Sequence, residues 1–145
     1  MLVGRNDGIL DKKSRVAFPK RFRIILGDKL IITEGFEKSL IVVSVEGWKA
    51  LLEGTEGKPF TTNTTRDTQR FLLGQAAFVD LDEKGRFIIP DHLKIHANLI
   101  SEIVFLGLSR YVEVWDKKTW EEYHRELAKN ISSIAEKLSG KDSNE

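Results

Sequence analysis

Two segments of the sequence decide the fold: Asp11-Lys12-Lys13-Ser14-Arg15 and, 71 residues later, Asp82-Glu83-Lys84-Gly85-Arg86. Both have the form Asp-x-x-x-Arg, and both lead into a short apolar run that ends at a proline, Pro19 or Pro90. Matching segments continue in the same order at spacings of 71 to 73 residues: Phe22 with Leu93, residues 30–32 with 103–105, residues 40–43 with 112–115, and Trp48 with Trp120. An ordered series of this kind indicates an internal duplication that covers most of the chain.

Each copy predicts the order strand, strand, short helix, strand, strand. In the first copy we expect a helix at residues 20–26 and strands at residues 8–11, 16–18, 29–33 and 40–45. In the second copy we expect strands at residues 79–82, 87–89, 102–106 and 111–115. Pro19 and Pro90 suit the first turn of the short helices, and Gly27 suits a helix end.

Four short strands and one short helix cannot bury both faces of a sheet, so a single copy is not expected to be stable alone. Two copies packed together can bury a shared core in one small barrel with a pseudo-twofold axis. The expected fold class is therefore α+β with a mainly β core, built from two tandem ββαββ repeats and flanking helices. The expected segments are repeat 1 at residues 5–48, a helical connection with a surface loop at 49–75, repeat 2 at 76–119, and a C-terminal amphipathic helix and tail at 120–145.

Helices are expected outside the repeats. The first is a short helix that ends at Gly54 and carries an apolar stripe of Trp48, Leu51 and Leu52. Residues 54–64 are rich in Gly, Thr, Pro and Asn and predict a surface loop. A second helix, capped by Thr64 or Thr65, is expected to end at Gly74.

The last predicted helix begins after Asp116, which is a good N-terminal capping residue. Its apolar residues recur at steps of three and four positions, which is typical of one helix face: Trp120, Tyr123, Leu127, Ile131, Ile134 and Leu138. This stripe either packs on the protein's own barrel or forms a contact between subunits, and the sequence leaves both possibilities open. Residues 141–145 are predicted to be a frayed tail.

The composition excludes several classes of function. The chain of 145 residues has 23 basic and 22 acidic residues, a net charge of +1, and no cysteine. A disulfide framework, a thiolate zinc site and a cysteine nucleophile are therefore excluded. The longest apolar runs are strand-sized, and the first ten residues contain an acid and two glycines where a signal peptide needs an apolar segment. We expect a soluble intracellular domain.

The nearly neutral total hides a local excess of positive charge. Residues 1–23 contain seven basic and two acidic residues, whereas residues 113–145 contain six basic and eight acidic ones. An arginine offers a planar fork of donors for phosphate or guanine, and two strands joined by a tight turn fit the major groove of DNA. We therefore expect Arg15 and Arg86 to be the principal DNA contacts. We expect three lysines to bind DNA phosphates: Lys12, Lys13 and Lys84. Four further residues are expected to fix the shape of the turns: Asp11, Asp82, Ser14 and Gly85.

The doubled Asp-x-x-x-Arg turn, followed by a strand and a proline, resembles the MraZ family of bacterial transcriptional regulators. Residues 69–76 (QRFLLGQA) and 112–116 (VEVWD) also resemble segments of that family, and the resemblance covers roughly residues 1 to 130. It implies a swapped-hairpin barrel of the AbrB-like (SpoVT-AbrB) group, with both halves in one chain. It also implies binding to short direct DNA repeats upstream of the division and cell-wall gene cluster, and assembly into rings. This family commonly has Gly at the position of Ser14, so a positive φ there would cost Ser14 some backbone energy and make the two turns differ slightly.

Other interpretations remain open from the residues alone. The lysines and arginines of the turns could form a solvated surface, and Asp11 with Arg15 could be a surface ion pair without function. An AbrB-like antitoxin or another protein-interaction module is the second functional hypothesis, and a small enzyme is the third. His92 and His96 lie four residues apart, but the Glu of a zinc-protease motif is missing and no other catalytic motif stands out. We expect no metal, cofactor, membrane or small-molecule substrate. The expected partners are double-stranded DNA and further copies of the chain in a homo-oligomeric ring. The expected location is the cytoplasm, in association with the nucleoid.

Overall fold

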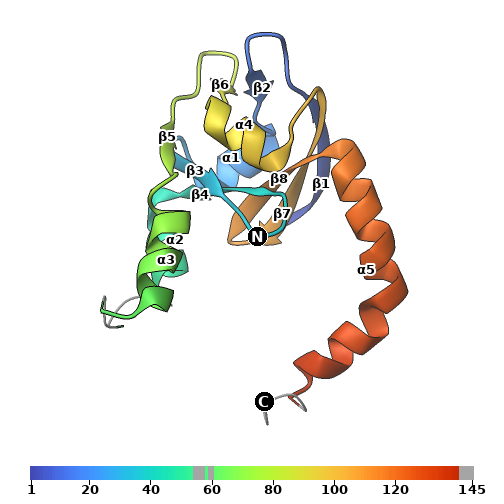
Figure 1. Cartoon of the computed structure of the whole chain (residues 1–145). Coiled ribbons are helices and arrows are strands. Elements are labelled where there is room, and N and C mark those ends of the chain that lie inside the picture. The colour runs from blue at the N-terminus through green and yellow to red at the C-terminus, as the bar shows by residue number, and fades with distance from the viewer. Residues whose placement is uncertain (54–57, 59–60, 141–145) are drawn as a thin grey trace.

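A computed structural model describes residues 1–53, 58 and 61–140 of the chain (Figure 1). The elements of the first repeat are β1 (Leu2–Ile9), β2 (Arg15–Ala17), α1 (Lys20–Leu26), β3 (Leu30–Glu34) and β4 (Leu40–Ser44). Those of the second repeat are β5 (Ala77–Val79), β6 (Arg86–Ile88), α4 (Asp91–Ala97), β7 (Glu102–Ser109) and β8 (Tyr111–Asp116). Helices α2 (Val45–Leu52) and α3 (Asn63–Leu72) connect the repeats, and α5 (Lys117–Leu138) follows the second. The predicted α+β class and the ββαββ order of each repeat are confirmed.

The first strand of each repeat differs from its predicted position. β1 starts at Leu2 and ends at Ile9, and β5 ends at Val79, so both strands stop before the aspartate of the following turn. The reason is that each aspartate uses its side chain and backbone within the turn instead of in a strand ladder. β1 is also longer than predicted because it pairs along its whole length with β7.

The strands are exchanged between the two repeats. β1 of the first repeat pairs with β7 of the second, and β5 of the second repeat pairs with β3 of the first. β2 pairs only with its counterpart β6, in a separate two-stranded ribbon. Because each repeat lends its first strand to the other, the six-stranded sheet needs both repeats, and the swapped arrangement is confirmed.

The register of the strands obeys a pseudo-twofold axis. Val16 pairs with Phe87, its own equivalent at the 71-residue spacing, and Ile41 pairs with Glu113, its equivalent at a spacing of 72. The axis therefore passes through the middle of the β2–β6 ribbon and the middle of the β4–β8 ladder. The strand order β1-β7-β8-β4-β3-β5 also reads the same when the two repeats are exchanged.

The hydrogen-bonded ladders do not close into the expected barrel. β1 and β5 form the two edges of the six-stranded sheet, and the β2–β6 ribbon is a second sheet of its own. β2 and β6 have only three residues each, and these residues pair with one another at the axis. The ribbon therefore covers one face of an open sheet instead of joining its edges.

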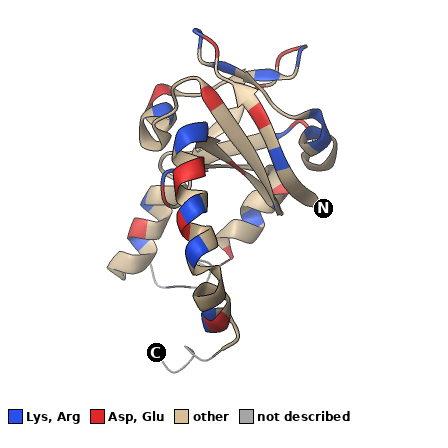
Figure 2. Cartoon of the chain, turned by 90° about the vertical axis from the view of Figure 1, so that its right-hand side faces the viewer, with Lys and Arg blue, Asp and Glu red and all other residues tan. Residues whose placement is uncertain are grey.

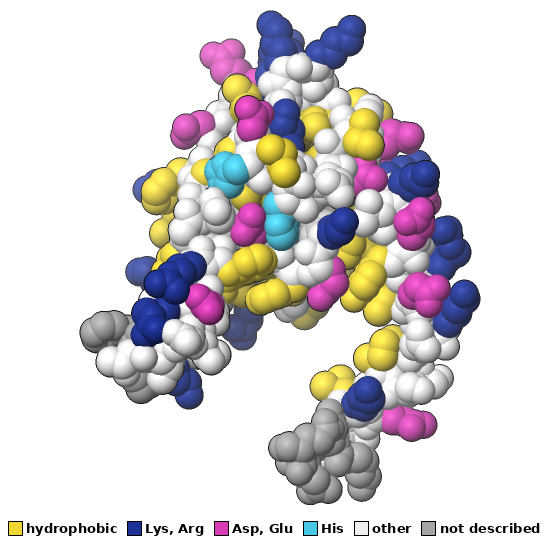
Figure 3. All heavy atoms as spheres, viewed as in Figure 1, with side chains coloured by type: hydrophobic (Ala, Val, Ile, Leu, Met, Phe, Trp, Pro, Cys, Tyr) yellow, Lys and Arg dark blue, Asp and Glu magenta, His cyan; other side chains and the backbone are white. Residues whose placement is uncertain are grey.

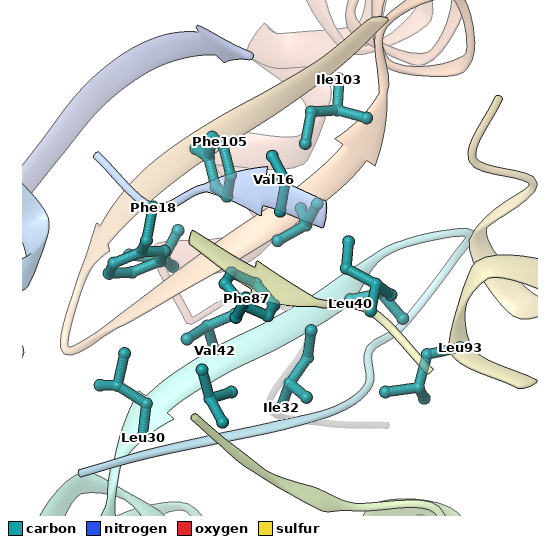
Figure 4. Packing of buried hydrophobic residues seen from close by; sticks show 14 of the residues in the cluster. Val16, Phe18, Leu30, Ile32, Leu40, Val42, Phe87, Leu93, Ile103 and Phe105 are labelled. Atoms are coloured by element: carbon teal, nitrogen blue, oxygen red, sulfur yellow. The ribbon is translucent and has the colours of Figure 1, made fainter. Parts of the chain in front are cut away.

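The main core lies between the six-stranded sheet and the β2–β6 ribbon (Figure 4). Val16 and Phe87 point inward from the ribbon and are 1% and 2% exposed. The ring of Phe18 meets the edge of Phe105 at a centroid distance of 5.7 Å, a favourable arrangement for two aromatic rings. Since both repeats contribute to this one core, burial of apolar surface holds the two turns in a fixed relation.

Helices α2 and α3 lie on one side of the molecule, and α5 extends away on the other (Figure 1). Asp116 caps α5 as predicted, since its carboxylate accepts from the backbone N–H of Thr119. α3 begins two or three residues earlier than predicted, with Thr62 as its cap instead of Thr64 or Thr65, because Thr62 offers the same capping hydroxyl. The predicted loop at 54–64 is therefore wrong at residues 63–64. Residues 54–57 and 59–60 of that loop, and the predicted tail at 141–145, lie outside the described residues.

The apolar stripe of α5 divides into two parts. Trp120 and Tyr123 pack on Trp115 of the protein's own sheet, with ring centroids 5.3 and 5.2 Å from it. Ile131, Ile134 and Leu138 lie further along and are 54%, 43% and 87% exposed. The interpretation that the stripe packs on its own sheet is therefore correct for the first half of the helix only. None of the described helices is both long and apolar enough to span a membrane.

Candidate nucleic-acid interface

The carboxylate of Asp11 organises the first turn. Its Oδ1 accepts hydrogen bonds from the backbone N–H groups of Lys13 and Arg15, both at 2.9 Å. Its Oδ2 accepts from Nε of Arg15 at 2.8 Å. The backbone N–H of Ser14 donates to the carbonyl oxygen of Asp11 at 3.0 Å and closes the turn. One carboxylate thus fixes both the backbone of the turn and the direction of the arginine side chain.

The second turn has the same hydrogen bonds. Asp82 accepts from the backbone N–H groups of Lys84 at 2.8 Å and Arg86 at 2.9 Å, and from Nε of Arg86 at 2.9 Å. Equivalent distances in the two turns agree within 0.1 Å. The recurrence of Asp-x-x-x-Arg in the sequence therefore reflects one local structure formed twice.

The fourth position of each turn lies in the left-handed region of the backbone. Ser14 has a φ of 62° and Gly85 a φ of 75°. A serine carries a conformational cost there that a glycine does not. The two turns differ mainly in what touches this position: Nζ of Lys94 donates to Oγ of Ser14, whereas Gly85 leaves room near the guanidinium of Arg23. Lys94 and Arg23 are themselves equivalent at the 71-residue spacing, so each short helix places a basic side chain beside the turn of the other repeat.

The β2–β6 ribbon brings the two arginines onto one surface. Arg15 lies opposite Ile88, and Arg86 lies opposite Ala17, while the intervening residues of both strands are buried. Because side chains alternate along a strand, Arg15 and Arg86 both lie on the outer face of the ribbon. The two turns project side by side from the same end of the molecule, each carrying basic and acidic residues (Figure 2).

The lysines of the turns are exposed around these arginines. Lys12, Lys13 and Lys84 are all exposed. Dark-blue side chains project at the end of the molecule where the turns lie, with acidic side chains beside them (Figure 3). The structure therefore places the five basic residues predicted for the site at one end of the molecule.

The orientation of the guanidinium groups leaves donors free. Arg15 and Arg86 are 31% and 29% exposed, and each binds its aspartate through Nε. Within the part of the chain that the structure describes, Nη1 and Nη2 of these two arginines have no hydrogen-bond partner. A guanidinium held in this way can present two parallel N–H groups to a phosphate or to the O6 and N7 atoms of guanine.

Three other basic residues of the first 23 bind groups within the protein. Nη1 of Arg21 donates to the carbonyl of Val3 at 2.6 Å. The other two form ion pairs, Arg5 with Asp7 at 2.8 Å and Arg23 with Asp28 at 3.0 Å. The local excess of positive charge predicted for residues 1–23 is therefore partly used in internal pairs, and what remains is concentrated at the first turn.

The two histidines of the HLKIH segment point to different carbonyl groups. Nε2 of His92 lies 3.0 Å from the carbonyl oxygen of Gln75, and Nε2 of His96 lies 3.1 Å from that of Gly35. His92 is the equivalent of Arg21, and both attach a short helix to the chain near an edge strand. No group of three or more metal-ligating side chains forms among the described residues.

Hydrogen bonding lowers the pKa of both turn aspartates. The pKa of Asp11 falls below its ordinary value mainly because the backbone N–H of Arg15 donates to the ionised carboxylate, and the Arg15 side chain adds to the effect. The backbone N–H of Arg86 lowers the pKa of Asp82 in the same way. A depressed pKa means that the folded state prefers the ionised carboxylate. Its contribution to stability is complete above the unfolded pKa of about 3.9 and is lost as the pH falls through the lower, folded value.

We therefore expect a specific pH dependence for the variant Asp11→Asn with Asp82→Asn. At pH 7 this variant will be less stable than the wild type, and the difference will shrink as the pH falls below the ordinary aspartate pKa of about 3.9 and the wild-type carboxylates become protonated. Urea denaturation at several pH values measures the difference. Asp67→Asn with Asp80→Asn is the matched control, because these exposed aspartates lie outside the turns. A stability difference that persists unchanged at pH 2.5 would contradict the role of the ionised carboxylates.

Fold and site together define a class of protein: a duplicated, strand-swapped α+β chain with two equivalent Asp-x-x-x-Arg turns on one surface. The family model described as "MraZ protein, putative antitoxin-like" matches residues 1–71 and again residues 72–141. The chain therefore belongs to the MraZ family, as the resemblance of its turns predicts. The two matches divide the chain at the connection between the two structural repeats.

Curated relatives extend over almost the whole chain. The "Transcriptional regulator MraZ" of Caldanaerobacter subterraneus subsp. tengcongensis is 38% identical over 138 residues, which is 95% of this chain and 96% of that protein. The proteins of the same name from Acetivibrio thermocellus and Moorella thermoacetica are 38% and 36% identical over the same shares. The family is thus one of transcriptional regulators, and a match of this extent covers both turns.

Proposed function

We propose that this chain is a sequence-specific DNA-binding transcriptional regulator that recognises short direct repeats upstream of the division and cell-wall gene cluster. The observation that carries the proposal is the pair of arginines on the outer face of the β2–β6 ribbon, each held through Nε by an aspartate. Arg15 and Arg86 contact bases in the major groove. A site of this kind acts in the cytoplasm, at the nucleoid.

The shape and charge of this end of the molecule support DNA as the ligand. A two-stranded ribbon is narrow enough for the major groove, which is roughly 12 Å wide. Lys12, Lys13 and Lys84 lie beside the arginines and bind backbone phosphates, which fix the position of the protein on the duplex. Asp11 and Asp82 do not contact DNA, because their carboxylates are engaged in the turns and would repel phosphate.

We also propose that binding requires a ring of several subunits. A single subunit offers only five basic contacts, and the second turn has Glu83 where the first has Lys12. Repeating a weak contact along the DNA raises the overall affinity through effective concentration. Direct repeats spaced near one helical turn suit such an array, since successive subunits then meet the same side of the duplex. The exposed second half of the α5 stripe supports an interface between subunits.

A titration of DNA binding against salt tests this function. The probe is the duplex from upstream of the protein's own gene, and a duplex of the same composition in scrambled order is the control. The logarithm of affinity should fall with the logarithm of salt concentration. Per subunit, the slope should lie between about −2.7, if only the three lysines neutralise phosphates, and about −4.5, if both arginines do so as well. Equal affinity for the two duplexes at every salt concentration would refute sequence-specific binding.

The antitoxin alternative has one observation in its favour, the wording "antitoxin-like" in the description of the family. An antitoxin of the AbrB-like group would usually combine one half of the barrel with a disordered tail that neutralises a partner. This chain has both halves, and the segment after the second repeat is a helix of 22 residues. The regulator is therefore the better supported function.

A further inference from the structure

The outer face of the β2–β6 ribbon carries an unequal pair of apolar side chains next to the arginines. Ile88 is 64% exposed and lies directly across the ribbon from Arg15. At the equivalent position of the first repeat, Ala17 lies across from Arg86. Side chains directly opposite one another on two antiparallel strands have their Cβ atoms about 4.5–5.5 Å apart, so each arginine has one apolar residue directly across the ribbon. Only the residue across from Arg15 is large.

Because of this inequality, the two ends of the ribbon surface are chemically different. The strand order and register obey the pseudo-twofold axis, but the side chains around the arginines do not. The end near Arg15 combines Ile88 with the basic first turn, whereas the end near Arg86 combines the smaller Ala17 with a turn that contains Glu83. A DNA site that fits one end is therefore not the best fit for the other.

The position of Ile88 favours DNA over protein as its partner. A single exposed isoleucine on a protein surface needs no special explanation. Ile88, however, lies directly across the ribbon from Arg15 and two residues along its own strand from Arg86, on the same outer face. A second copy of this face would bring like charges together, whereas a DNA duplex neutralises them. Inside the major groove, the apolar feature that a base edge offers is the C5-methyl group of thymine.

We propose that Ile88 contacts the methyl group of a thymine next to the base pair that Arg15 contacts. Ala17 is too short for the equivalent contact beside Arg86. Each subunit therefore reads a non-palindromic sequence in one orientation, with its basic first turn at a fixed end of that sequence. This inference rests on the proposed function, and it assigns a specificity-determining role to a residue that carries no charge and no hydrogen-bonding group.

The test uses a DNA sequence that the wild-type protein selects from a pool of random duplexes. Each thymine of this duplex is then replaced in turn by deoxyuridine, which lacks the methyl group and keeps the base pairing. The wild type should lose affinity about fourfold at one such position, the effect of one methyl contact. Ile88→Ala should lose a similar factor on the thymine duplex and should show no further loss at that deoxyuridine.

A matched variant and an exchange variant complete the experiment. Ile95→Ala removes an isoleucine that is 74% exposed on α4, outside the ribbon, and it should keep the wild-type sensitivity to deoxyuridine. The double variant Ala17→Ile with Ile88→Ala should select a sequence in which the preferred thymine has moved to the side read by Arg86. Thermal unfolding monitors the fold of each variant, and the deoxyuridine series on the wild type needs no variant at all.

The outcomes separate this inference from the proposed function. If the wild type selects no sequence from the pool, the proposed function fails. If the wild type selects a sequence but no single deoxyuridine lowers its affinity, the role of Ile88 is refuted while the function stands. The role of Ile88 is likewise refuted if Ile88→Ala keeps the full sensitivity to deoxyuridine.

Discussion

Replacing both Arg15 and Arg86 with alanine is expected to lower specific binding to the upstream duplex by about 30-fold or more. A good bidentate contact between an arginine and a guanine contributes about 1–3 kcal/mol of discrimination, and this variant removes two such contacts. Each single substitution should cost roughly fivefold or more. The loss should be larger for Arg15, because the lysine-rich first turn holds that end of the site closer to the DNA. A gel-shift titration measures all three variants.

Two further variants separate base reading from simple charge. Arg15→Lys with Arg86→Lys keeps both positive charges but loses the planar fork and the Nε bond to each aspartate. This variant should retain the salt dependence of non-specific binding and lose the preference for the upstream sequence. Arg110→Ala is the matched control, since this exposed arginine follows Ser109 at the end of the β1–β7 ladder away from the turns. Undiminished specific binding by the double alanine variant would refute the assignment of the site.

The parts of the site that the sequence predicts are those with local causes. An aspartate four residues before an arginine can bind the backbone of its own turn and the arginine side chain, whatever the rest of the chain does. The same is true of the cap at Asp116 and of the helix after Pro19. Because these interactions span only a few residues, their residue types and spacing are sufficient to predict them.

The parts that sequence reasoning misses depend on distant segments. The length of β1 is determined by its pairing with β7, about a hundred residues later, and not by its own composition. The contact of Lys94 with Ser14 joins the two repeats and is not predicted from either segment alone. The 71-residue spacing of Lys94 and Arg23 is the one feature of the sequence that points to equivalent positions beside the two turns. Equally, the sequence alone could not reveal that Arg21 is bound by the edge strand and removed from the basic surface.

Substitutions in the exposed half of α5 are expected to have the second large effect, on assembly and on DNA affinity. If the proposed ring forms through this stripe, Ile131→Asp with Ile134→Asp is expected to give smaller species and to lower affinity for the upstream duplex by about 10²–10⁴-fold through loss of avidity. The two isoleucines are 54% and 43% exposed. Hydrophobic side chains are visible on the side of α5 that faces the rest of the molecule (Figure 3). Analytical ultracentrifugation measures the assembly, and a gel shift measures the affinity.

A ring requires two different surfaces that fit each other, because a head-to-tail contact closes only through such a pair. The stripe of α5 is one candidate surface, and the exposed residues Leu73 and Phe78 near the edge strand β5 offer an apolar counterpart on the opposite side. Leu73→Asp with Phe78→Asp should therefore disrupt assembly as the α5 variant does. Mixing the two defective variants should give dimers and no larger species, because each retains one intact surface.

The matched control for the α5 variant adds two aspartates elsewhere on the same helix. Ser132→Asp with Ser133→Asp changes residues beside the stripe, so the ring and the affinity should remain as in the wild type. Near-UV circular dichroism of Trp115 and Trp120, which pack together where α5 meets the sheet, verifies that its first half stays in place. A monomeric α5 variant that binds the upstream duplex as tightly as the wild type would show that one subunit is sufficient. In that case the arginines and lysines of one subunit, without repetition along the DNA, would have to supply the whole affinity.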